Sequence, residues 1–418
     1  MAVADEANLE HRVLSNGLVL VAEPMASVRS AAFSLLVPAG SAYDRETTPG
    51  AASMLCEWVM RGAGERDSRE LVDALDELGV SHASGAQSVH ASFSAVTLGT
   101  NLPAVLSIFA DVLRRPRFVE EEIDPIRALA LQGLQALEDD PGTKVIHELR
   151  RRHYPDPWGR PSSGTPEGIQ ATDAAVLREQ HARNYRPNGT ILAVAGAIDL
   201  EDLVATVERL FGDWEPIPEP TLVERRTGPA RDHLYKETQQ IQIATAHPTV
   251  PVVHPDYYLA RAVAAILGGY SSSRLFTEVR EKRGLCYSVY SSYESRRDQA
   301  AIVCHAGTSV DRAQETLDVT LGELERISSK GVDRDELDTM RASLKSSLIM
   351  QQESSMSRSA SLASDHYHLG RVRSLEEISA ALDALTPDAV GEFAARHVPR
   401  ELTIVTLGPQ PLNLPPEA

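Results

Sequence analysis

Residues 271–289 read SSSRLFTEVREKRGLCYSV, and this stretch sets the pattern of the whole fold. Ser272 and Ser273 favour the start of a helix, because a serine hydroxyl accepts a hydrogen bond from a backbone N–H of the first turn. The pattern predicts a helix over 274–282, which Gly284 is placed to end, since glycine tolerates the left-handed conformation that follows many helices. A strand is predicted from Tyr287 onward.

The same order of elements occurs earlier in the chain, which predicts a tandem duplication. The matching stretches are 69–78, Gly79 and 89–97 in the first half, and 274–282, Gly284, 287–293 and 300–306 in the second. We expect a two-stranded passage over 89–97, as over 287–306. A period of about 205 residues is too long for a solenoid and fits a duplicated domain.

A proline-rich stretch separates the two halves. It carries Pro216, Pro218, Pro220 and Pro229, and such composition is typical of a linker. We therefore expect an N-terminal domain over 1–212, a linker over 213–230 and a C-terminal domain over 231–418. Strand-like and helical patterns alternate in each half, so each domain is predicted to be α+β, with one mixed or antiparallel sheet and helices mainly on one face.

The composition argues against several classes of function. The chain has 41 Lys and Arg against 59 Asp and Glu, a net charge of −18, so neither nucleic acid nor an anionic membrane surface is an expected partner. The first residues show no signal-peptide pattern, and the most apolar early stretch, 31–39, is too short to span a bilayer. Three cysteines without a CxxC pair favour a reducing compartment, so we expect a cytoplasmic location.

The stretch 271–289 resembles the second-domain motif of the pitrilysin family, SSRLF followed by REKRGLxYxV. That family includes insulin-degrading enzyme and mitochondrial processing peptidase. Three segments of the first half also resemble family loops: GSAYD at 40–44, GTPE at 164–167, and YRPN at 185–188 ahead of Gly196. The resemblance covers nearly the whole chain and implies the two-domain fold of a zinc peptidase.

The resemblance breaks down at the metal. Active members of the family carry an H-x-x-E-H motif, in which two histidines bind zinc and the glutamate is the general base, and a later glutamate completes the ligands. Here Ser53 and Glu57 stand at the histidine positions, Cys56 at the base and Gly133 at the later glutamate. Because catalytic zinc takes three protein ligands, the resemblance implies that this chain binds no catalytic metal.

Other interpretations of Cys56 stay open. A nucleophilic cysteine needs a histidine base within reach, and no histidine is near Cys56 in the sequence. A small buried core cysteine is the more ordinary interpretation. A weaker possibility is a peptidase that acts alone through an unconventional site at Cys56 and Glu57.

Arg280 and Tyr287 match the arginine and tyrosine of the family motif. By residue type alone, a surface arginine in an ion pair and a tyrosine packed in a strand would be ordinary. The resemblance implies instead that the pair contacts the substrate at a zinc site, where a guanidinium and a phenol stabilise the developing oxyanion.

Some enzymes of the family's small bacterial branch are split between two subunits, of which one supplies the zinc motif and the other the arginine and tyrosine. The resemblance therefore implies a subunit that is inactive alone, pairs with an HxxEH-bearing homologue that holds the zinc, and acts on a peptide. A non-proteolytic scaffold or peptide-binding subunit is the alternative, and without its partner the chain could form a homodimer.

Overall fold

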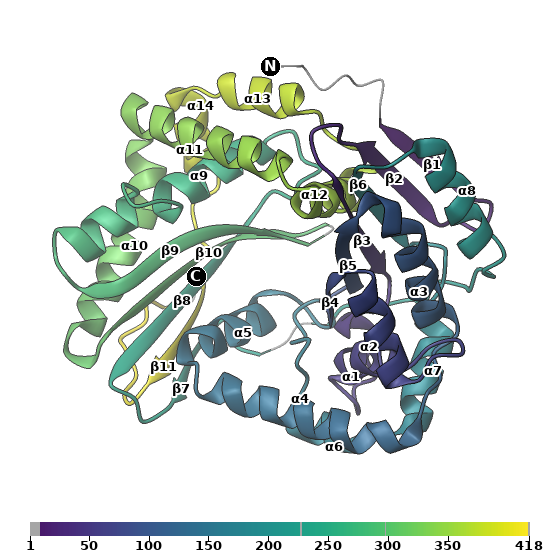
Figure 1. The fold of residues 1–418 in the computed structure, drawn as a ribbon. Coiled ribbons are helices and arrows are strands. Elements are labelled where there is room, and N and C mark those ends of the chain that lie inside the picture. The colour runs from purple at the N-terminus through teal and green to yellow at the C-terminus, as the bar shows by residue number, and fades with distance from the viewer. Residues whose placement is uncertain (1–8, 226–227, 297, 417–418) are drawn as a thin grey trace. The chain divides into compact units, whose positions relative to one another are not determined.

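The computed structural model describes residues 9–225, 228–296 and 298–416, so residues 226–227 of the predicted linker lie outside the described part. The chain forms two compact units, each built around one sheet (Figure 1). The first unit contains the residues up to Ala136, Asp156–Glu224 and Met350–Val372, and the second contains Leu137–Pro155, Arg225–Ile349 and the residues from Arg373 onward.

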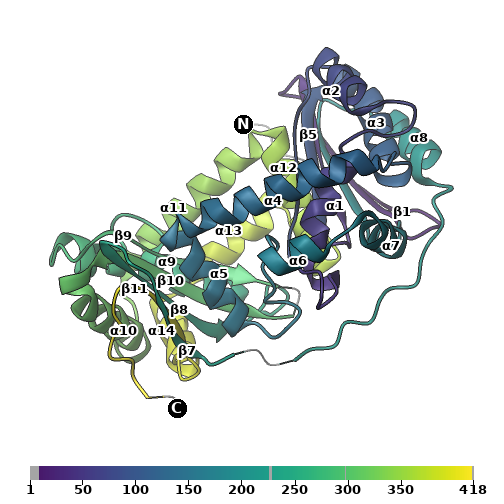
Figure 2. The same cartoon turned by 90° about the horizontal axis from the view of Figure 1, so that it is seen from below.

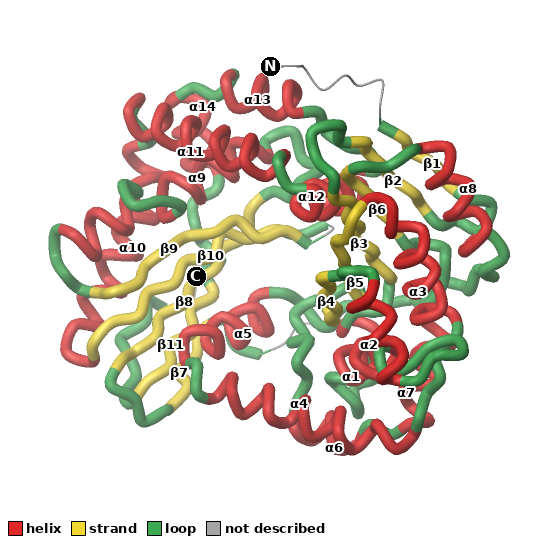
Figure 3. The backbone as a smooth tube through the Cα atoms, viewed as in Figure 1, coloured by secondary structure: helices red, strands yellow, loops and turns green. Residues whose placement is uncertain are grey.

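The elements of the first unit are coloured by type in Figure 3. They are β1 (Glu10–Val13), β2 (Val19–Pro24), β3 (Ser30–Val37), α1 (Ala51–Val59), α2 (Ser68–Glu77), β4 (Ser81–Ala86), β5 (Ala91–Leu98), α3 (Leu102–Arg114), most of α4 (Ile123–Glu138), α6 (Pro166–Ala171), α7 (Ala174–Asn184), β6 (Ile191–Gly196), α8 (Leu200–Phe211) and α12 (Ser355–Leu369).

The second unit has five strands and a corresponding set of helices (Figures 1 and 2). They are α5 (Pro141–His153), β7 (Arg231–Tyr235), β8 (Gln240–Thr249), α9 (Tyr257–Gly268), β9 (Cys286–Ser295), β10 (Ala300–Ser309), α10 (Ala313–Lys330), most of α11 (Arg334–Gln352), α13 (Leu375–Asp383), α14 (Pro387–Arg396) and β11 (Thr403–Gly408).

Both sheets are mixed. In the first, the strand order is β1-β2-β6-β3-β5-β4, with β2 and β6 parallel and the other neighbours antiparallel. In the second, the order is β7-β11-β8-β10-β9, with only β7 and β11 parallel. The predicted class, two duplicated α+β domains, is confirmed.

Side-chain alternation along the strands builds two cores in the first unit. Leu20 and Phe33 point to the face that α1, α3 and α8 cover, and the Phe33 ring meets the edge of Phe109 at a centre distance of 5.0 Å. The intervening residue Val21 points to the opposite face, where it packs with Leu362 of α12. The period-two pattern therefore reflects burial on both faces of the sheet.

The second unit repeats this plan. Ile243 and Ile302 pack with α9, α10 and α14 on one face. Helix α5 contacts β8 and β11, and its side chains Val145, Ile146 and Leu149 are buried. In each unit, one helix from the other half of the sequence covers the second face of the sheet.

Polar contacts fix these two exchanged helices. On α12, Arg358 forms an ion pair with Glu23 of β2, and the Ser355 and Ser30 hydroxyls lie 3.0 Å apart. On α5, the Arg150 Nε donates to Glu294 of β9 at 2.9 Å. The expected boundary at 213–230 assigns each domain one continuous stretch of sequence. The compact units differ from these domains, because each unit includes one helix from the other half of the sequence.

One local prediction was wrong, and a second gave the helix but missed its type. The passage predicted over 89–97 contains only β5, because its hairpin partner β4 precedes it at Ser81–Ala86, where small and polar residues hide the strand pattern. The helix predicted over 274–282 contains a π-helical turn, Phe276–Glu281, which a 3.6-residue pattern does not foresee.

We predict that Arg358→Ala lowers the free energy of unfolding of the first unit by about 2–3 kcal/mol, because it leaves the half-buried Glu23 carboxylate unpaired. All three tryptophans, Trp58, Trp158 and Trp214, belong to this unit, so urea denaturation followed by tryptophan fluorescence reports on it. Arg12→Ala, which removes the exposed pairs with Glu10 and Glu208, should leave the stability nearly unchanged. Equal losses in the two variants would contradict this account of α12 docking.

Candidate functional site

The positions that match the family's zinc motif lie on α1 and α4. Helix α1 begins after Gly50, whose φ of 105° favours glycine. The buried Asp44 carboxylate accepts the N–H groups of Gly50 and Ala52 at 2.8 Å each and the Gln180 amide at 2.8 Å. Burial raises the pKa of Asp44 to about 6. Asp44, which belongs to the GSAYD segment that resembles a family loop, thus fixes the start of α1.

Cys56 is part of the core. Its side chain is buried, and its Sγ lies 3.9 Å from the phenol oxygen of Tyr185, which is its hydrogen-bond partner. Burial raises the pKa of the Cys56 thiol to about 12. A thiol is nucleophilic as its thiolate, so this environment opposes nucleophilic catalysis.

A histidine packs against the tyrosine that contacts Cys56, and the sequence did not reveal it. His181 stacks on the Tyr185 ring at a centre distance of 4.6 Å. Its Nε2 donates to the carbonyl of Leu113 at 2.9 Å, and burial lowers its pKa to about 4. His181 is therefore a neutral packing residue, and it makes no hydrogen bond to Cys56 in the part of the chain that the structure describes.

The remaining positions also do not fit zinc. Glu57 accepts hydrogen bonds from the Arg61 guanidinium at 2.6 and 3.1 Å. Gly133 has no side chain, and the space where a Cβ would lie is open. With Ser53 at the remaining position, these residues do not supply three ligands. Across residues 9–225, 228–296 and 298–416, no three His, Cys, Asp or Glu side chains are grouped to hold a metal ion.

The structure brings Arg280 and Tyr287 together. The guanidinium carbon of Arg280 lies 5.2 Å from the Tyr287 ring centre and 4.7 Å from that of Phe276. Both distances are typical of cation–π contacts. Tyr287 is 80% exposed at the start of β9. The pair thus presents a guanidinium and a phenol on one exposed surface.

The neighbouring charges leave Arg280 available. Glu278 accepts hydrogen bonds from Lys282 at 2.7 Å and Arg283 at 2.6 Å, and these contacts lower the pKa of Glu278 to about 2. No carboxylate among the described residues forms an ion pair with Arg280. Its N–H donors are therefore free for another acceptor, whereas the two cations beside it are neutralised.

The backbone between Arg280 and Tyr287 is fixed by hydrogen bonds from residues that follow β9 in the sequence. Gly284 has a φ of 59°, which reverses the chain after the π-helical turn. Arg312 Nη1 donates to the Gly284 carbonyl at 2.9 Å, and the Thr308 hydroxyl donates to that of Leu285 at 2.6 Å. These contacts fix where β9 begins and hence where Tyr287 lies.

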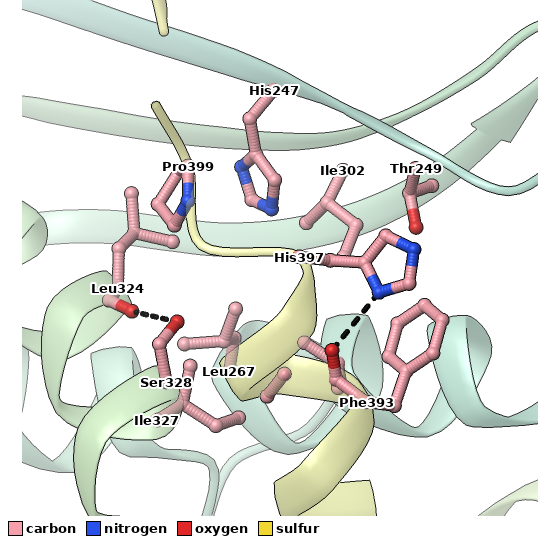
Figure 4. A pocket seen from close by; sticks show the side chains of 12 residues that line it. His247, Thr249, Leu267, Ile302, Leu324, Ile327, Ser328, Phe393, His397 and Pro399 are labelled. Carbon is pink, nitrogen blue, oxygen red and sulfur yellow. Dashed lines mark hydrogen bonds between the residues drawn. The ribbon is translucent and has the colours of Figure 1, made fainter. Parts of the chain in front are cut away.

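A small pocket occurs elsewhere in the second unit (Figure 4). Its lining includes His247 and Thr249 of β8 and Phe393 of α14, and the Nδ1–H of His397 donates to the Phe393 carbonyl at 2.9 Å. The buried His247 Nδ1 and Thr249 hydroxyl make no hydrogen bond within the described part of the chain. The pocket has room for about one water molecule, so it is too small for a peptide.

Thiol labelling tests the account of Cys56. Cys56 and Cys304 are buried and Cys286 is partly exposed, so iodoacetamide at pH 9 should label the folded protein first at Cys286. Burial raises the pKa of Cys286 only to about 11, which leaves it about tenfold more thiolate than Cys56. Cys286→Ser should remove the first labelling phase. Labelling of Cys56 as fast as Cys286 would contradict the buried-core assignment.

Acid denaturation tests His181. Its folded pKa of about 4 lies below the unfolded value of 6.5, so the unfolded state binds the proton first as pH falls. The contribution of neutral His181 to the free energy of unfolding is therefore present above pH 6.5. It falls by about 2–3 kcal/mol as the pH is lowered towards 4. His181→Gln, followed by tryptophan fluorescence in urea, should show less acid destabilisation than wild type or than His82→Gln, an exposed control. Equal acid sensitivity would contradict the assignment.

Comparisons with known proteins agree with this architecture. Residues 19–164 match the family model described as insulinase (peptidase family M16), and residues 172–344 match the model described as peptidase M16 inactive domain. A protein of Mycobacterium tuberculosis described as an uncharacterized zinc protease is 28% identical, over 95% of this chain and 92% of that protein. One from Bacillus subtilis with the same description is 26% identical, over 94% and 97%.

Solved structures show the same fold. A crystal structure of a peptidase M16 inactive domain from Pseudomonas fluorescens has a TM-score of 0.89 at 23% identity, and covers 98% of this chain and 100% of its own. A chain of complex III from Candida albicans has a TM-score of 0.81 at 18% identity, over 96% and 95%. Since the two matched models together cover most of the sequence, this chain belongs to the M16 family of peptidases.

Proposed function

We propose that this chain is the non-zinc-binding subunit of a two-subunit M16 peptidase, and that it supplies Arg280 and Tyr287 to the zinc site of its partner. The observation that carries the proposal is that Arg280 and Tyr287 are in contact while the charge of Arg280 is not neutralised by any described carboxylate. Arg280 lies against the exposed Tyr287 ring and has no carboxylate partner among the described residues, while the adjacent Lys282 and Arg283 both bind Glu278.

The chemistry of the two side chains fits peptide hydrolysis. Attack on a peptide carbonyl places negative charge on its oxygen, and fixed donors aimed at that oxygen stabilise the transition state. A guanidinium and a phenol on a restrained turn are such donors. A zinc ion in the partner would polarise the same carbonyl and activate the attacking water.

The residues at the zinc-motif positions of this chain also support a zinc site that lies in the partner subunit. Ser53, buried Cys56, paired Glu57 and side-chain-free Gly133 do not form a ligand set. We therefore expect an HxxEH-bearing homologue as partner, with the peptide adding as a strand to a sheet edge of that subunit. Inactivity alone, a cytoplasmic location and a homodimer in the partner's absence are parts of the same proposal.

A scaffold or peptide-binding subunit is the second candidate. It is favoured by the likeness of the fold to a chain of complex III, which extends over 96% of this protein. A scaffold has no need of an unneutralised arginine beside an exposed phenol, so the Arg280/Tyr287 geometry weighs against it. The two candidates make opposite predictions for peptide hydrolysis by a reconstituted pair.

No helix within the described residues combines the length and the apolar character that crossing a membrane requires.

The proposal predicts that only a mixture of this chain with an HxxEH-bearing homologue from the same organism hydrolyses peptides. Tyr287→Phe or Arg280→Ala should lower kcat of the mixture by about tenfold or more, because each removes one oxyanion donor. The measurement is the rate of cleavage of a fluorogenic peptide library by each subunit alone and by the pair.

Two matched variants control for non-specific effects. Tyr235→Phe removes the hydroxyl of another exposed tyrosine in the same unit, and Arg283→Ala removes a neighbouring arginine that Glu278 already neutralises. Both should retain the wild-type rate. Cleavage by this chain alone would contradict the proposal, and a stable pair that cleaves nothing would favour the scaffold.

A further inference from the structure

Two histidines meet in the first unit, on the face of the first sheet that α12 covers. His11 lies on β1, the outermost strand of that sheet, and is exposed. His366 lies near the C-terminal end of α12 and is partly exposed. Both elements belong to the first unit and are labelled in Figure 1. The proposed peptidase function uses neither side chain.

The two rings point their nitrogens at each other. His11 Nε2 and His366 Nδ1 lie 3.3 Å apart, whereas the ring centres are 5.0 Å apart. Because the nitrogens are closer than the centres, they occupy the facing edges of the two rings. A separation of 3.3 Å is slightly longer than the usual range of about 2.7–3.2 Å for hydrogen bonds from N–H donors.

This spacing fits two ligands of one metal ion. Imidazole nitrogens bind zinc at about 2.0–2.1 Å, so two of them at a tetrahedral angle are about 3.3–3.4 Å apart. If both rings point at the ion, their centres are about 5 Å apart. We propose that His11 and His366 form a site for a divalent transition-metal ion such as Zn²⁺.

The chemistry of the donors defines the class of ion. Imidazole nitrogen suits Zn²⁺, Ni²⁺ and Cu²⁺, and Cu²⁺ binds most tightly in this series. Among the described residues, no third His, Cys, Asp or Glu joins the pair, so water would fill the remaining positions, and the site would not be a catalytic one, which takes three protein ligands. The site is separate from the degenerate positions Ser53, Cys56, Glu57 and Gly133, which lie on α1 and α4.

The location gives the ion a structural effect. His11 and His366 are 355 residues apart in the sequence, so the unfolded chain rarely brings them together. An ion that binds only the folded form stabilises it. Here it would fasten the outer strand β1 to α12, the helix that the second half of the sequence contributes to this unit.

The test uses untagged, metal-free protein and two probes. Titration calorimetry with Zn²⁺ should show one saturable site, and His11→Gln and His366→Gln should each weaken its affinity by at least tenfold. Electron paramagnetic resonance of one equivalent of Cu²⁺ should show coupling to two nitrogens in wild type and to one in either variant. His82→Gln, which removes an exposed histidine of β4, should behave as wild type.

Stability provides an independent readout. The midpoint of urea unfolding is measured by tryptophan fluorescence. Zn²⁺ in about hundredfold excess over its Kd should raise this midpoint for wild type and for His82→Gln, but not for His11→Gln. If wild type shows no saturable Zn²⁺ site, or if His11→Gln and His366→Gln bind as tightly as wild type, the pair is only a hydrogen-bonded contact and the proposal is overturned.

Discussion

Each sheet of this protein contains a strand that is buried on both faces, and this constraint organises the rest of the chain. All six residues of β6 in the first unit, and all six of β11 in the second, are buried. The helices of the same half cover one face only. The second face would expose apolar surface at a cost of about 25 cal/mol per Å², and α12 and α5 cover it instead. Each unit therefore depends on a helix from the other half of the sequence.

The position of the candidate site follows from the same framework. Strand β9 is the outermost strand of the second sheet and pairs only with β10, so its first residues are accessible. The π-helical turn before it directs Arg280 onto the ring of Tyr287, and Arg312 and Thr308 hold the intervening backbone. A flexible loop would lose entropy on ordering two donors around a substrate, whereas this turn is already ordered.

Much of the fold was predictable from the sequence, because the helix, glycine and strand pattern occurs twice and the motif at 271–289 is specific. The joint placement of Arg280 and Tyr287 was also expected, although their contact was not. The exchange of α5 and α12 was not predictable, since amphipathic periodicity shows that a helix buries a face but not which sheet receives it. Strand β4 was missed because Ser81–Ala86 lacks the bulky alternation that marks strands.

The contacts of the side chains around the degenerate metal positions were also only partly predictable from the sequence. The sequence predicted which residues replace the zinc ligands, and it left Cys56 open between a nucleophile and a core residue. The structure favours the core residue, because burial raises the pKa of its thiol and its partner is the phenol of Tyr185. His181 stacks on the ring of Tyr185 but is distant from Cys56 in the sequence, so only the fold could reveal that it lies against the partner of Cys56 and donates to the Leu113 carbonyl.

A structure of the reconstituted pair with an uncleaved peptide would test the central claim most directly. The account predicts that the Tyr287 phenol and the Arg280 guanidinium lie within about 2.7–3.1 Å of the oxygen of the peptide carbonyl at the partner's zinc. A peptide bound at zinc with both side chains pointing into solvent, or a metal ion bound at Cys56 and Glu57 of this chain, would contradict it.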